Sequence, residues 1–152
     1  MVAVFSLVAA LTSVYVSVYA IRKGNKNSSI ATLVVLTEAL REAWGKFILS
    51  IKAVQKEPQS ECNRYMYLSE LMNVIEAGCA IQNEKSLSGV SKDLMKSHLV
   101  NSLELLVGND YARSEIPKML TDSTTFEHIK KFLKSQRNYR SRIIIPVEWY
   151  EL

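Results

Sequence analysis

The first segment constrains this chain most, because residues 2–21 contain no charged side chain. Twenty residues of α-helix span about 30 Å, which is the thickness of the hydrocarbon core of a bilayer. The run is rich in Val, Leu, Ile and Phe, which favour insertion, and no Asp, Lys or Arg opposes them. We therefore predict that residues 1–21 form a transmembrane anchor.

The orientation of this anchor follows from the cations behind it. Arg22, Lys23 and Lys26 come directly after the apolar run, and short cationic segments stay on the cytoplasmic side. We expect a single-pass membrane protein with its N-terminus outside and its C-terminal domain cytoplasmic. A cleaved signal peptide and a buried core helix are the alternatives. A signal peptide would use residues 18–20 as its cleavage site, but no positively charged region precedes the apolar run.

Small residues recur within the anchor at spacings of four, three, four and three, which places them on one helical stripe. Such stripes let membrane helices approach closely, so self-association into a homo-oligomer is a hypothesis. Common use of Ala and Ser in membrane segments explains the stripe equally. The candidate packing residues are Ser6, Ala10, Ser13, Ser17 and Ala20.

The rest of the chain is predicted to be helical, since it has few helix breakers: the whole chain contains only five Gly and three Pro. We expect an all-α fold, an N-terminal transmembrane helix followed by a small bundle of four to five helices. A basic polar joint at 22–29 should separate the anchor from a helical domain at 30–138. Residues 139–152 should form an extended tail, because Pro146 disfavours helix at the residue before it.

Apolar residues at three-or-four spacing mark the individual helices. The first helix of the domain should begin after a cap at Ser28 or Ser29 and run to about residue 56, and a second should span about 60–83. A third is capped by Ser91 and ended by Gly108 and Asn109. A short fourth at 110–120 is interrupted at Pro117, and a fifth follows a cap at Asp122 or Thr124. The expected stripe residues are Leu33, Leu36, Leu40, Trp44, Phe47, Ile51 and Val54; Leu68, Leu71, Met72, Ile75, Cys79 and Gln82; Leu94, Met95, His98, Leu99, Ser102, Leu103 and Leu106; and Phe126, Ile129, Phe132 and Leu133.

The sequence contains no recognisable catalytic, metal-binding or cofactor motif, with no Gly-rich phosphate loop, CxxC, HExxH or GxSxG. Cys62 and Cys79 share one predicted helix about 25 Å apart, so we expect buried or half-buried free thiols in a reducing compartment. His98 and His128 are more typical of core or boundary histidines than of ligands. We therefore expect no enzyme activity and no cofactor, and we expect solvated or hydrogen-bonded roles for the carboxylates of Glu70, Glu76 and Glu104.

The C-terminal region carries the most informative charge. Residues 123–147 hold six cations against one acid, a net charge of +5, whereas residues 57–122 hold six cations against ten acids, a net charge of −4. Anionic lipid, nucleic acid or the protein's own acidic helices could meet this segment, and a solvated basic helix end is the structural alternative. The candidate anion-binding residues are Lys130, Lys131, Lys134, Arg137, Arg140 and Arg142.

The stretch Tyr67-Leu68-Ser69-Glu70-Leu71-Met72-Asn73-Val74-Ile75-Glu76 resembles an uncharacterised bacterial family of small, membrane-tethered helical proteins. The matching pieces are Asn73 and Glu76, the break near Gly89 and the helix from Lys92 to Leu106. Asn83-Glu84-Lys85-Ser86 departs from the family's Gly-x-x-Asp/Glu at the break. The resemblance implies an architecture and no activity. A structural role also suffices, with Asn73 and Glu76 serving a loop or a neighbouring helix end.

The sequence thus predicts a membrane-anchored helical protein-interaction or scaffold protein without catalytic activity, whose partners are the lipid bilayer and a protein. A membrane-tethered binder of nucleic acid or anionic lipid, using the basic segment from Lys130 to Arg142, is the alternative. An enzyme with an unrecognised helical active site is the third possibility.

Overall fold

The computed structural model consists of five α-helices and describes residues 2–53, 60–120 and 126–136, with the side chains of residues 2–23, 25, 26, 53, 60 and 136 left out. The helices are α1 (Val2–Ala53), α2 (Ser60–Asn83), α3 (Gly89–Val107), α4 (Asp110–Leu120) and α5 (Glu127–Gln136). The predicted all-α class is confirmed for the described residues. Arg137, Arg140, Arg142, Val54 and the expected tail at 139–152 lie outside them.

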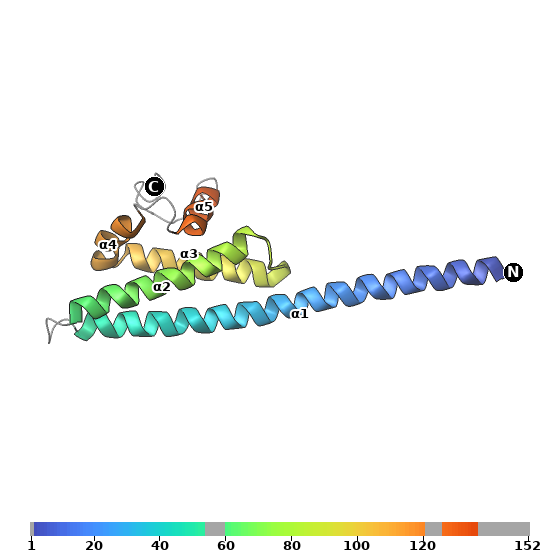
Figure 1. Cartoon of the computed structure of the whole chain (residues 1–152), viewed down its shortest axis with the longest axis horizontal. Coiled ribbons are helices and arrows are strands. Elements are labelled where there is room, and N and C mark those ends of the chain that lie inside the picture. Colours follow the sequence, from blue (N-terminus) through green and yellow to red (C-terminus); the bar gives the residue numbers. More distant parts are fainter. Residues whose placement is uncertain (1, 54–59, 121–125, 137–152) are drawn as a thin grey trace.

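Helix α1 is the longest element, with 52 residues that extend about 78 Å at the helical rise. Its C-terminal half packs along α2 and α3, and its N-terminal half projects beyond the other helices (Figure 1). The expected break at 22–29 is absent, because the helix is continuous through these residues. A single Gly24 weakens a helix by only about 1 kcal/mol, and no proline follows it in α1.

Ser29 shows why a cap at this position was the wrong prediction. The side chain of Ser29 is buried, and its hydroxyl lies 3.3 Å from the hydroxyl of Ser88, which precedes α3. Ser29 is therefore a packing residue in the interior of α1, and its polar group has a partner in the loop between α2 and α3. Sequence neighbours alone give no sign of this contact, because 59 residues separate the two serines.

The hydrophobic core lies where α2 meets α1, α3 and α5, and it follows the predicted stripes. Leu40 and Phe47 of α1 are buried, and Leu33, Leu36, Trp44 and Ile51 pack at its edge. Every predicted apolar stripe residue of α2 and α5 is buried, and so are the predicted residues of α3 apart from Leu94 and His98. The fully buried large side chains include Leu68, Leu71, Met72, Ile75, Met95, Leu99, Leu103, Leu106 and Phe132.

The start of α3 and the interior of α4 differ from the predictions. Helix α3 begins at Gly89, after Ser88, and Asn109 caps the next helix, since its Oδ1 accepts a hydrogen bond from the Ala112 N–H at 3.0 Å. Helix α4 continues through Pro117 to Leu120. Buried Ile116 and Leu120 hold that last turn in the core, which offsets the loss of one helical hydrogen bond at proline. Helix α5 begins at Glu127, directly after Phe126 with φ +57, and the expected cap residues Asp122 and Thr124 lie outside the described residues.

Candidate interaction site

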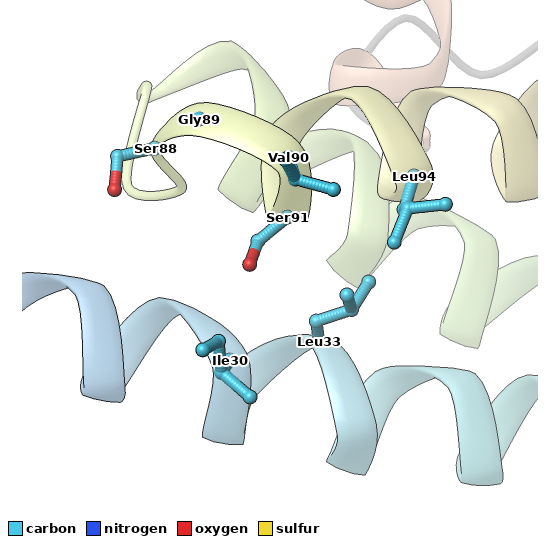
Figure 2. A pocket seen from close by; sticks show the side chains of 7 residues that line it. All are labelled: Ile30, Leu33, Ser88, Gly89, Val90, Ser91 and Leu94. Carbon is cyan, nitrogen blue, oxygen red and sulfur yellow. The ribbon is translucent and has the colours of Figure 1, made fainter.

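An apolar pocket of about 510 Å³ opens between α1 and the start of α3. Its lining residues are Ile30, Leu33, Ser88, Gly89, Val90, Ser91 and Leu94. Figure 2 shows Leu33 and Leu94 pointing toward one another across the pocket, with the Ser91 hydroxyl directed toward α1. Ile30, Val90 and Leu94 are exposed for 44%, 73% and 46% of their surface. These apolar side chains therefore meet solvent at the rim of the pocket.

The loop before α3 positions one wall of this pocket. Gly89 has φ +54, in the left-handed region that favours glycine, and this conformation turns the chain from the loop into α3. No side-chain hydrogen bond caps α3 at Ser88, because the Ser88 hydroxyl faces that of Ser29. The pocket is thus formed by a turn held against α1 by a serine pair.

Helix α5 is held on α2 by a carboxylate. Glu76 accepts hydrogen bonds from the backbone N–H groups of His128 and Ile129, both at 2.8 Å. Asn83 donates from its side-chain amide to the His128 carbonyl at 2.9 Å. A negative charge at a helix N-terminus is favourable because it satisfies free N–H groups and faces the positive end of the helix dipole. The expectation that Glu76 serves a neighbouring helix end is confirmed, whereas Asn73 is exposed.

Two further polar contacts join the helices. Lys46 of α1 donates to Glu70 of α2 at 2.7 Å and also pairs with Glu42 at 3.1 Å, and these bonds raise the pKa of Lys46. The Arg64 guanidinium of α2 lies 3.6 Å from the centre of the Tyr111 ring of α4, a cation–π contact. Burial raises the pKa of the Tyr111 hydroxyl.

The carboxylates of Glu70, Glu76 and Glu104 have separate surroundings. Glu70 pairs with Lys46, Glu76 caps α5, and Glu104 is exposed on α3. These positions confirm hydrogen-bonded or solvated roles. Within the side chains that the structure describes, no three His, Cys, Asp or Glu residues gather as metal ligands would.

The histidines and cysteines occupy separate environments. His98 is exposed, which corrects its place on the buried stripe of α3, and His128 is half-buried with Nδ1 unpartnered among the described residues. Both cysteines are free thiols, as expected, and Cys79 is buried, but Cys62 is exposed, which corrects the expected burial of that side chain. Burial, followed by the nearby charge of Glu76, raises the pKa of Cys79 well above its usual value.

The predicted anion-binding residues are only partly described. Lys131 and Lys134 are exposed on α5, and Lys130 is half-buried. Lys131 forms an ion pair with Glu127 at 2.6 Å, which lowers the pKa of Glu127. This pair offsets one of the three lysine charges within α5 itself.

The predicted membrane-packing residues lie on α1, but their side chains are outside the described residues: Ser6, Ala10, Ser13, Ser17 and Ala20. A search of the described residues finds no helix long and apolar enough to cross a bilayer. The anchor at 1–21 lies outside that search and stays a prediction.

Comparison of this chain with protein-family models, with curated proteins and with solved structures gives no match. The resemblance of the Tyr67–Glu76 stretch to a membrane-tethered family therefore stays an expectation.

The pocket and the outer face of α1 were not predicted from the sequence. Val34 and Val35 do not lie on the predicted core stripe, and neither does Val90, yet all three are large and apolar. They are exposed for 61%, 68% and 73% of their surface. Large apolar residues outside the core stripe of an amphipathic helix indicate an exposed apolar surface. This pattern could have predicted both the pocket and the outer face of α1.

Proposed function

We propose that this chain is a membrane-anchored helical protein-interaction protein without catalytic activity, whose domain lies in the cytoplasm. One observation carries the interaction role: the large apolar side chains left exposed gather mainly on α1 and α3. They are Ile30, Val34, Val35, Ile48 and Leu49 on α1, Val90, Leu94 and Leu105 on α3, and Tyr65 and Met66 on α2. Three of these residues, Ile30, Val90 and Leu94, line the same pocket, and a group of exposed apolar side chains is typical of interaction sites.

The continuity of α1 supports the anchored arrangement. The uncharged run at 2–21 and the core-forming residues Leu40 and Phe47 belong to one helix without a break. Ile30, at the pocket, follows Ile21 by nine residues, about 13 Å along the helix. In the proposed arrangement the pocket stands just outside the headgroup region, and a continuous helix holds the domain at a defined distance from the bilayer.

Extraction of membranes tests the anchor. Replacement of Val8 and Leu11 by arginine puts two charges near the centre of the run, and each disfavours insertion by about 3 kcal/mol. The unmodified chain should resist carbonate and high salt, whereas V8R/L11R should be released. N27R adds one cation to an exposed position of α1 outside the run and should stay in the membrane. Release of the unmodified chain by carbonate would contradict the proposal.

Photo-crosslinking tests the interaction surface in the same membranes. A photoreactive residue at Leu94, on the pocket rim, should give a discrete adduct with a protein. The same residue at Asp93 is exposed one position away on α3 and does not line the pocket, so it should give none. Equal adducts at both positions, or none at Leu94, would count against a partner at the pocket.

A membrane-tethered binder of nucleic acid or anionic lipid is the second candidate, because Lys131 and Lys134 are exposed on α5. It ranks second since Glu127 already pairs with Lys131. Salt-dependent binding would separate it from the first candidate, because contacts to phosphate weaken steeply as salt rises.

A further inference from the structure

The outer face of α1 is apolar at two places and has no cover in the described structure. Helices α2 and α3 lie along one side of α1, and the opposite side is open (Figure 1). Val34 and Val35 are exposed there for 61% and 68% of their surface, and Ile48 and Leu49 for 44% and 68%. Fourteen residues, or two heptads, separate the two apolar pairs.

The exposed residues between and around these pairs follow a seven-residue repeat. Spacings of three and four connect six positions that are all exposed: Ala31, Val34, Glu38, Arg41, Gly45 and Ile48. A strict repeat of this kind keeps one seam of a helix facing a second helix when the two supercoil with a left hand. At Gly45 an added Cβ would meet no atom within 4 Å, so a neighbouring helix has room to approach closely.

The centre of this seam carries one charge of each sign. Glu38 and Arg41 form an ion pair within α1, and their side chains are 64% and 78% exposed. They occupy adjacent layers of the repeat. When two copies of the seam meet in parallel, Glu38 and Arg41 each lie opposite their own copies, and Arg41 of each copy also comes within reach of Glu38 of the other in the adjacent layer. The charged centre is therefore neutral as a whole, while the valines and Ile48 supply apolar contact on either side.

We propose that a second copy of this chain packs along this face, with the two α1 helices parallel. The parallel direction rests on the proposed function, because two copies anchored in one bilayer must enter it the same way. The repeat also continues toward the N-terminus through exposed Asn27 and Gly24. The same spacing of three and four residues then reaches the predicted stripe residues Ala20 and Ser17. In this arrangement Val34 and Ile48 each face their own copies, and Ile30 lies beside Val35 of the second copy.

Charge reversal in the full-length chain tests the seam. Glu38→Arg makes both central layers cationic, and Arg41→Glu makes both anionic. In detergent micelles each single variant should self-associate at least tenfold more weakly than the unmodified chain, and a mixture of the two should regain association. Failure of the unmodified chain to associate would overturn the proposal. So would a mixture that associates no better than either variant alone.

Disulfide formation tests whether the two α1 helices are parallel. Carbonate extraction of the same membranes tests the anchor separately. In a Cys62→Ser background, V34C should cross-link with itself on oxidation, whereas K92C, at an exposed position of α3, should not. Cross-linking of V34C only when mixed with G45C would show antiparallel helices and overturn the parallel arrangement. A V34C chain that resists carbonate but does not cross-link defeats this inference alone. A cross-linked dimer released by carbonate defeats the anchor and leaves the seam in place.

Discussion

The carboxylate of Glu76 on α2 accepts a hydrogen bond from the backbone N–H of Ile129 on α5, across 53 residues of sequence, and its other oxygen accepts one from the neighbouring N–H. The first turn of α5 thus takes its cap from another helix. Phe126, directly before α5, has φ +57 and a buried side chain. Since Phe offers no polar side-chain atom for capping, the start of α5 depends on α2.

Removal of the Glu76 carboxylate should therefore destabilise the fold. We expect Glu76→Ala to lower the free energy of unfolding by about 1–2 kcal/mol, the range for a lost N-terminal cap, and Glu76→Gln to lower it less. Thermal or urea unfolding measures both. Glu104→Gln changes an exposed carboxylate on α3 and should leave stability within about 0.5 kcal/mol. Equal stability of the Glu76 and Glu104 variants would show that the cap contributes nothing.

The two cysteines should differ in reactivity. Cys62 is exposed, and Cys79 is buried with its pKa raised well above the usual value, so the Cys79 thiolate is scarce at mildly alkaline pH. A thiol reagent at about pH 8 should modify one cysteine per folded chain and two after unfolding. Cys62→Ser should abolish the reaction of the folded chain. Rapid modification of folded C62S would mean that the α2 core is open around Cys79.

A pair of glycine variants compares a packed helix position with an open one. A Cβ on Gly78 would lie 2.8 Å from Cδ2 of buried Leu99, whereas a Cβ on Gly45 would meet nothing within 4 Å. Both substitutions by Ala gain about 1 kcal/mol of helix propensity. Crowding against Leu99 should leave G78A about 1–3 kcal/mol less stable than G45A. Chemical denaturation of the two variants measures this difference, and equal stability would exclude close α2–α3 packing at Gly78.

The second candidate function predicts retention on a polyanion such as heparin at low salt. Replacing Lys131 and Lys134 by Glu should lower the salt concentration at which the chain elutes, because each lost phosphate contact reduces the salt dependence. Lys85→Glu with Lys92→Glu makes the same change in net charge at exposed positions outside α5. This control should have a smaller effect. A chain that is not retained at low salt is not a nucleic-acid or anionic-lipid binder.

Periodicity predicted much of this fold, because helix burial follows local spacing. The limits of α2 at Ser60 and Asn83 agree with the pattern, and the predicted core residues Phe47, Ile75 and Phe132 are buried. The basic segment was also visible in the sequence, although its pairing with Glu127 needed the structure.

The wrong predictions concern helix ends, where distant contacts override local signals. The polar residues at 24–29 indicated a joint, but α1 is continuous through them and Ser29 contacts Ser88 in the loop before α3. The start of α5 depends on Glu76, and α4 passes through Pro117 because buried Leu120 lies beyond it. The outer seam of α1 was not predicted, because only the core-facing stripe of apolar residues was considered in that helix.

The anchored, cytoplasmic domain is the central claim, and Cys62 offers the most direct measurement of it. Cys62 is exposed at the start of α2, and Cys79 is buried, so a membrane-impermeant maleimide reports on Cys62 in the folded chain. We expect no labelling in intact cells, full labelling after the membrane is permeabilised, and recovery of the labelled chain in the carbonate-resistant pellet. Labelling of Cys62 in intact cells would contradict the cytoplasmic domain, and labelled chain in the carbonate supernatant would contradict the anchor.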